Sequence, residues 1–165
     1  MNVASRHHLV LALYPTTQGF SFALFEGPLS PYDWGVFEAR GSAKNRRCIQ
    51  RISQLFGKYC PDAVVLQDMS AAGTFRARRI RALNEAIELL ADTQGYPVFS
   101  YSRAQVRQSF PPPATKQRIA EVIAKHIPAF QNLVPPTRRI WMSESPRMGL
   151  FDAAALAWRH YHAPQ

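Results

Sequence analysis

The sequence predicts one α/β domain built on a mixed five-stranded sheet with helices on its flanks. Its first forty residues contain three short apolar strands joined by short polar links, which is typical of an antiparallel meander. Beyond them, apolar residues at helical spacing alternate with two short buried strands. Strands that are joined through whole helices usually lie parallel, so the last two strands are expected to be parallel to their neighbours. A chain of 165 residues is long enough for one hydrophobic core, which predicts a single domain over residues 1–165.

The first two strands are indicated by the segment LVLALYPTTQGFSFALFEG, which reads as apolar strand, polar turn and apolar strand. Residues 16–19 supply the turn, and Gly27 with Pro28 interrupts the second strand. In the third strand, Trp34 and Val36 alternate with residues of the opposite face. The three strands are expected at about residues 9–14, 20–26 and 33–40.

The later elements follow from apolar spacing and from the residues that end helices. Pro61 ends the first helix and Gly95 ends the second. Ser102 and Gln105 have the spacing of a capping box, which predicts a short helix from Ser102. Four prolines within residues 128–146 predict an extended loop before the last helix. The buried strands are expected at 63–67 and 98–101, and the helices at about 43–59, 74–93, 102–110, 114–127 and 147–161.

The charge balance points to a polyanionic partner. The chain has 20 Lys and Arg against 11 Asp and Glu, which gives a formal net charge of +9. Most of these cations are arginines, whose planar fork binds two phosphate oxygens at once. Nucleic acid is the partner that this composition favours, and a generally solubilising basic surface is the alternative.

Other features of the sequence limit the compartment. No stretch of about 18 apolar residues occurs, so no membrane span is expected. The apolar run LVLALY is too short for a secretory signal. Cys48 and Cys60 have no further Cys or paired His ligands around them in the sequence, so we expect reduced, partly buried thiols on either side of a helix rather than a zinc site. A cytoplasmic location is the resulting expectation.

Three of the eleven acids are candidates for chemistry, because most others lie on polar helix faces or beside turns. Asp68 ends a buried strand, where an open sheet places its site, although it could equally cap the following turn. Asp152 lies near the start of an apolar helix, where the helix dipole favours an ionised acid and a late helix cap is the alternative. Glu144 is either a third site acid or a loop acid paired with a nearby arginine, of which the sequence offers Arg138, Arg139 and Arg147.

Several segments, taken in order, resemble the RuvC-like branch of the RNase H-like superfamily, the Holliday-junction resolvases and their relatives. DAVVLQDMS resembles the family's fourth strand with its acid, here Asp68. VFSYSRAQVRQSF followed by ATKQRIAEVIAKHI resembles its strand, short basic helix and Lys-containing helix. GLFDAAALAWRHY resembles its last helix, whose acid is here Asp152. The opening hairpin matches in form, so the resemblance spans nearly the whole chain and implies an RNase H-like sheet.

The resemblance implies hydrolysis of phosphodiesters by two Mg²⁺ ions about 4 Å apart, held by carboxylates. The family's usual site has four acids, one on the first strand, one on the fourth and two on the last helix three residues apart. This sequence has Tyr14 at the first position and Gly149 three residues before Asp152. A phenol, with a pKa near 10, is a poor ligand for Mg²⁺ at neutral pH. The candidate catalytic and metal-binding residues are therefore Asp68, Asp152 and Glu144, with Mg²⁺ or Mn²⁺ as the ion.

Basic residues in the same segments are candidates for nucleic-acid binding. One group begins the helix after Asp68, and the other lies in the segments that resemble the family's basic element. These residues are Arg76, Arg78, Arg79, Arg81, Arg103, Arg107, Lys116 and Arg118. Three aromatic residues are interleaved with them and are candidates for stacking on bases. Core packing is the alternative for each of them, and it is the favoured interpretation for Tyr101. They are Phe75, Tyr101 and Phe110.

Two functions are consistent with these features. One is a metal-dependent endodeoxyribonuclease with a reduced metal site that acts on branched or otherwise structured DNA. The other is a catalytically degenerate relative that binds structured nucleic acid without cleaving it. The missing acids favour the degenerate relative, whereas the family resemblance favours the nuclease, since substituted sites sometimes recruit a replacement ligand, and the overall prediction leans to the nuclease. A phosphate-binding hairpin of an RNase H-like ATPase, suggested by PTTQG, is disfavoured because such ATPases need two lobes and a much longer chain. Resolvase relatives act as dimers on two symmetric strands, so the resemblance also raises a homodimer, which the sequence does not decide.

Overall fold

The computed structural model describes residues 9–70 and 76–163 and contains the mixed five-stranded sheet that the sequence predicts. The strands are β1 (Val10–Pro15), β2 (Gly19–Phe25), β3 (Pro31–Glu38), β4 (Ala63–Gln67) and β5 (Val98–Tyr101). Their order across the sheet is β3-β2-β1-β4-β5. β1 pairs antiparallel with β2, and β2 with β3, whereas β4 lies parallel to both β1 and β5. The predicted fold class is confirmed.

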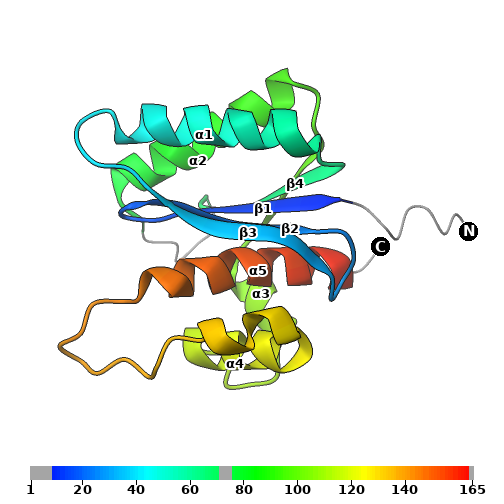
Figure 1. The fold of residues 1–165 in the computed structure, drawn as a ribbon, viewed down its shortest axis with the longest axis vertical. Coiled ribbons are helices and arrows are strands. Elements are labelled where there is room, and N and C mark those ends of the chain that lie inside the picture. The colour runs from blue at the N-terminus through cyan, green and yellow to red at the C-terminus, as the bar shows by residue number, and fades with distance from the viewer. Residues whose placement is uncertain (1–8, 71–75, 164–165) are drawn as a thin grey trace, which may run out of the picture.

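Helices cover both faces of this sheet (Figure 1). On one face lie α1 (Lys44–Tyr59) and α2 (Arg78–Thr93). On the other face α5 (Pro146–His162) packs against β1 and β2, and α4 (Lys116–His126) and α3 (Arg103–Gln108) pack on α5. α5 is buried over most of its length because it lies between the sheet and α4. This layering places the first turns of α5 and α4 beside the end of β1.

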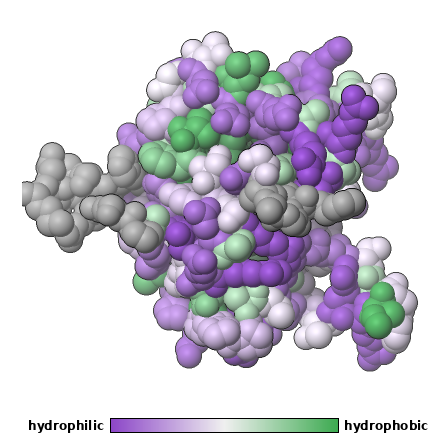
Figure 2. Space-filling view, turned by 180° about the vertical axis from the view of Figure 1, so that it is seen from behind, coloured by the Kyte–Doolittle hydropathy of each residue, from purple (hydrophilic) through white to green (hydrophobic). Residues whose placement is uncertain are grey.

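The chain between α4 and α5 differs from the predicted loop. Its first six residues form a 3-10 helix, η2 (Pro128–Leu133), because a proline is tolerated at a helix start and Phe130 is fully buried. The remainder, residues 134–145, is a loop that stands away from the body of the protein (Figure 2). α2 begins at Arg78 rather than near residue 74, and residues 71–75 lie outside the described part of the chain.

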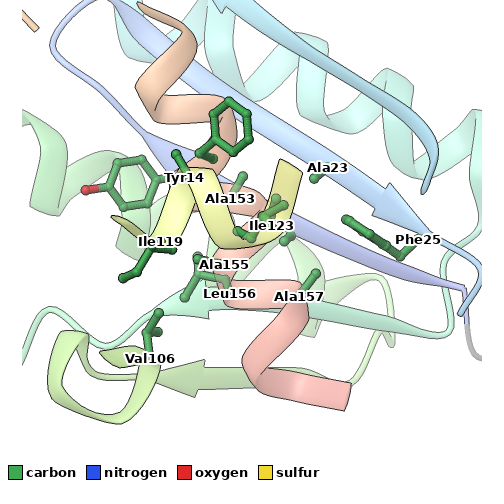
Figure 3. Close-up of a cluster of buried hydrophobic side chains, with 14 of the residues drawn as sticks. Tyr14, Ala23, Phe25, Val106, Ile119, Ile123, Ala153, Ala155, Leu156 and Ala157 are labelled. Atoms are coloured by element: carbon green, nitrogen blue, oxygen red, sulfur yellow. The ribbon is translucent and has the colours of Figure 1, made fainter. Parts of the chain in front are cut away.

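Strand alternation divides the core into two clusters. Leu11 and Leu13 of β1 pack toward α1 and α2, whereas Val10, Ala12 and Tyr14 pack toward α5. Figure 3 shows the second cluster, in which alanines of α5 lie against the sheet. Because alanine side chains are small, this helix approaches β1 and β2 closely. Tyr14 lies at the edge of the cluster, with its hydroxyl directed away from the apolar side chains (Figure 3).

The two cysteines of α1 and its C-terminal cap differ in burial. Cys48 is buried against the α1 and α2 cluster, whereas Cys60 ends α1 in a left-handed conformation and is exposed. Both thiols are free, as expected, but only Cys48 is buried. Among the described residues, no helix has the length and apolar character that crossing a membrane requires.

Candidate nucleic-acid interface

Tyr14 and Gln67 lie side by side at the carboxyl ends of the neighbouring strands β1 and β4. β1 and β4 are parallel and pair Ala12 with Val65, so continuing this register by two residues sets Tyr14 beside Gln67. Both side chains line a small cavity together with Asp152 of α5. Gln67 is 7% exposed, and its side-chain oxygen has no hydrogen-bond partner in the structure. An amide and a phenol thus occupy the strand ends where the resemblance implies carboxylates.

The first turns of α5 bring Asp152 to this edge. Ser145 caps the helix by accepting a hydrogen bond from the Arg147 amide, and Pro146 occupies its first position. Gly149, one turn before Asp152, lies against the opening hairpin. A Cβ atom at Gly149 would lie 2.6 Å from Ser21 Oγ and 3.0 Å from Thr16 Cγ2. The position that would carry the second acid of the implied helix pair is thus a glycine, and α5 lies too close to the hairpin for a side chain at residue 149.

Lys116, in the first turn of α4, supplies the positive charge beside Asp152. Its ammonium lies 3.0 Å from Glu144 Oε1 and 3.4 Å from Asp152 Oδ2. It also lies 6.0 Å from the centre of the Tyr14 ring. The Asp152 side chain is only 16% exposed, whereas Glu144 is 45% exposed. Lys116 is thus a cation shared by two carboxylates and an aromatic ring.

Burial controls the electrostatics of these groups. It raises the pKa of Asp152 to about 6 against the opposing attraction of Lys116, and this is the opposite direction to the helix-dipole effect expected from the sequence. Burial works to lower the pKa of Lys116, but the nearby Asp152 and the other partners outweigh it and raise that pKa above its ordinary value. Burial and the charge of Asp152 raise the pKa of Tyr14 as well. At neutral pH the site therefore holds a protonated lysine, an ionised Asp152 and a neutral phenol.

Asp68 is not brought to this site. It follows Gln67 on β4, so its side chain leaves the strand on the opposite face. Its carboxylate accepts hydrogen bonds from the amide and the hydroxyl of Ser70, at 2.9 and 2.6 Å. Asp68 therefore caps the following turn, which was the alternative role predicted for it from the sequence. The structure therefore places Asp68 apart from Asp152 and Glu144, and the three acids of the predicted set are not gathered at one place among the described residues. The sequence pattern predicts Asp68 as the acid of this strand end, and the position of Gln67 beside Tyr14 follows only from the strand register.

A groove runs from the end of β1 to the foot of the 134–145 loop. It has a volume of about 550 Å³. Arg76, Arg103 and Lys116 are the basic residues that line it, and the acids Glu38, Glu144 and Asp152 line it too. Arg107 lines the adjoining small cavity, again with Arg103 and Lys116. Four of the eight predicted nucleic-acid-binding residues are therefore gathered at one place.

Comparison with known proteins relates this geometry to a fold. No family model and no curated protein matches the sequence. The solved structure of Thermus thermophilus RuvC in complex with a Holliday junction substrate matches with a TM-score of 0.65 at 18% identity, covering 95% of each chain. A second solved structure of Thermus thermophilus RuvC matches with the same TM-score of 0.65 at 18% identity, covering 94% of this chain and 95% of its own. The yeast mitochondrial Holliday junction resolvase Ydc2 matches with a TM-score of 0.61 at 14% identity, covering 95% of this chain and 80% of its own.

The chain has the RuvC-like fold. The order of strands and helices inferred from the resemblance is thereby confirmed, at identities that establish the fold alone.

The residues of this site do not fit the two-metal arrangement that the resemblance implies. Tyr14 and Gly149 stand where two of the four carboxylates are expected, Gln67 rather than Asp68 lies beside Tyr14, and the acid that remains, Asp152, is paired with Lys116. Among residues 9–70 and 76–163, no three Asp, Glu, His or Cys side chains gather closely enough to hold a metal ion. Mg²⁺ requires several hard oxygen ligands, and one lysine-paired carboxylate with a neutral amide and phenol does not supply them.

The other predicted binding residues of the RuvC-like domain have different surroundings. The Arg79 guanidinium donates to the carbonyls of Thr16 and Thr17 and to Asn45, so it holds the hairpin turn in place. Arg118 lies on the exposed side of α4, 4.0 Å from Glu121. Arg78 and Arg81 are exposed on α2 and line neither the groove nor the small cavity.

Arg76 has a double role, because it donates to the Tyr14 hydroxyl at 2.6 Å and to the Pro15 carbonyl at 2.7 Å while lining the groove.

Two of the three aromatic residues predicted to stack on bases are not available to do so. Phe110 is buried and stacked on Trp158, and Tyr101 is half-buried with its hydroxyl 2.8 Å from His160 Nδ1. Both therefore pack in the protein, and Phe75 lies outside the described residues.

Proposed function

We propose that this chain binds branched or otherwise structured DNA through the groove beside α3, α4 and α5, without a divalent metal ion and without efficient cleavage. The observation that carries the proposal is the position of Lys116. Its ammonium lies between the carboxylates of Asp152 and Glu144, where a metal nuclease would need a divalent cation. A protonated amine there compensates the acid charge and leaves the surrounding arginines available for phosphates.

The charges of the groove support a phosphate ligand. Arg76, Arg103 and Lys116 line it and Arg107 adjoins it, against the three acids Glu38, Asp152 and Glu144, of which the last two are already paired with Lys116. Arg103 and Arg107 are exposed, so their guanidinium groups are accessible to a ligand. Arginine forks bind two phosphate oxygens with directional hydrogen bonds, and the formal net charge of +9 attracts a polyanion over a longer range.

The choice of branched DNA rests on the fold. A RuvC-like structure with a TM-score of 0.65 was solved with a Holliday junction substrate, and this chain covers 95% of it. The alternative is a nuclease in which Lys116 moves aside and Asp152 and Glu144 hold a single ion. The shared contact of both carboxylates with one ammonium is the observation that favours this alternative.

Fluorescence anisotropy with a labelled four-way junction and a linear duplex of the same arm sequences tests the binding proposal. In EDTA, we expect tighter binding of the junction and a steep loss of affinity with salt. Arg103→Ala and Arg107→Ala should each weaken binding and reduce the salt dependence by about one phosphate contact. The matched control is Arg118→Ala on the exposed side of α4, which should bind as the wild type does. Binding that requires Mg²⁺, or an equal loss in the control, would refute the proposal.

A further inference from the structure

The tip of the loop at residues 134–145 is a turn whose two central residues are apolar. The Met142 amide donates to the Arg139 carbonyl at 2.9 Å, so residues 139–142 form a β-turn whose two corners are Ile140 and Trp141. Such corners usually carry Gly, Asn, Asp, Ser or Pro. Here Ile140 is fully exposed, Trp141 is 75% exposed and Met142 is 45% exposed. Burial in the core does not explain these residues.

Both feet of the loop are fixed to the first turn of α4. The Gln117 side chain donates to the Pro135 carbonyl at 2.9 Å, and Lys116 forms its ion pair with Glu144. The intervening residues project from the body, and Figure 2 shows a hydrophobic surface on this projection among hydrophilic neighbours. The structure therefore holds the 139–142 turn at a defined place rather than leaving it on a free tether.

The foot of the loop belongs to the groove. Ser143, Glu144 and Ser145 line it together with Arg103 and Lys116. Trp141 is three residues from Glu144, so its Cα lies within about 11 Å of the Glu144 Cα, even if the chain is fully extended. The turn therefore begins within about 11 Å of a residue that lines the groove, which is close enough for DNA held in the groove to lie beside it.

The charges around the turn suit a polyanion. Arg138, Arg139 and Arg147 are all exposed, and the Arg139 guanidinium lies 5.5 Å from the centre of the Trp141 ring. The only acid between residues 134 and 147 is Glu144, which is paired with Lys116 at the foot. An aromatic ring with exposed arginines around it is the arrangement that stacks on a nucleobase while the cations contact phosphates.

We propose that the 139–142 turn is a stacking wedge that receives an unstacked base at the branch point of DNA held in the groove, with Trp141 against the base and Ile140 beside it. The proposal rests on the proposed function, since the groove positions the arms that meet at the turn. Apolar wedges of this kind contact bases only where the stack is already opened or easily opened, so the turn selects branched DNA over continuous duplex.

The test uses the full chain with Trp141→Ala and the conservative Trp141→Phe. Trp141→Ala should weaken four-way junction binding about 5- to 100-fold and leave continuous duplex binding within twofold of the wild type, whereas Trp141→Phe should retain most of the junction affinity. Circular dichroism of both variants should match the wild type, since the residue is exposed. A 2-aminopurine placed at the branch point should be quenched by the wild type and not by Trp141→Ala.

Three outcomes separate the possibilities. If Trp141→Ala binds the junction as tightly as the wild type while Arg103→Ala weakens it, the wedge is refuted and the groove proposal stands. If the wild type binds neither DNA, both proposals fail. If DNA binding is unaffected but Trp141→Ala abolishes binding to phosphatidylglycerol vesicles, the turn is a membrane contact and the wedge is refuted.

Discussion

Replacing Asp152 by Asn should stabilise the protein at neutral pH. Burial raises the pKa of Asp152 from 3.8 to about 6, and its side chain is only 16% exposed. Each pKa unit corresponds to about 1.4 kcal/mol, so the ionised carboxylate costs about 3 kcal/mol of folding free energy at pH 7. The value of about 3 kcal/mol already includes the attraction to Lys116, because the pKa of about 6 is the net result of burial, which raises it, and of Lys116, which lowers it. Asn removes the charge and keeps the shape, so Asp152→Asn should recover about this amount.

The gain should depend on pH with a defined sign. Below pH 3.8 the carboxyl group is protonated in both the folded and the unfolded chain, so wild type and variant should not differ. As the pH rises from 3.8 to about 6, the unfolded chain loses this proton while the folded chain keeps it, and the wild type loses stability relative to the variant. Above about pH 6 the difference should be constant.

Urea unfolding of both proteins at pH values between 4 and 7.5 measures this difference. The matched control is Glu144→Gln, because Glu144 contacts the same lysine but is 45% exposed, and its replacement should change stability by no more than about 0.5 kcal/mol. The reasoning is refuted if Asp152→Asn is less stable than the wild type at pH 7. That result would mean that the Lys116 pair stabilises the fold more than burial of the carboxylate destabilises it.

Three further variants test the structure of the site. Gly149→Ala should cost about 1–3 kcal/mol in thermal unfolding because its Cβ would contact Ser21 and Thr16, whereas Gly57→Ala, with open space around it, should be neutral or slightly stabilising. Arg79→Ala should cost about 1–3 kcal/mol by removing the hydrogen bonds to Asn45 and to the Thr16 carbonyl, while the Thr17 carbonyl keeps its hydrogen bond from Lys44; Arg78→Ala, at an exposed position, should not, and equal losses would contradict the role given to Arg79. Combining Tyr14→Asp with Gln67→Glu should create Mn²⁺ binding that is measurable by calorimetry, and the wild type should show none; equal heats from both proteins would show that these two positions do not form a metal site.

Sequence patterns predicted the fold more fully than the site. Period-two and helical spacing, the Ser102 capping box and the helix-ending residues located the strands and helices, because these signals are local. The 3-10 helix at Pro128–Leu133 was missed, since prolines at a helix start read as a loop when the burial of Phe130 is unknown.

The site depended on contacts between distant residues. Tyr14, Asp152, Glu144 and Lys116 were singled out from the sequence, but their arrangement around one ammonium was not predicted. The choice between Gln67 and Asp68 required the register of β4 against β1, which no single-strand pattern contains. The roles of Arg79 and Phe110 likewise depended on partners elsewhere in the chain, the hairpin turn in one case and Trp158 in the other.

The proposed function is that the site holds branched DNA with its own cations and does not cut it. The most direct measurement is to incubate the protein with an end-labelled four-way junction in Mg²⁺, Mn²⁺ or EDTA, and to run each sample on native and denaturing gels. We predict a retarded complex in all three conditions and intact strands throughout. Metal-dependent nicking that Asp152→Asn abolishes would contradict the claim and would establish the nuclease alternative.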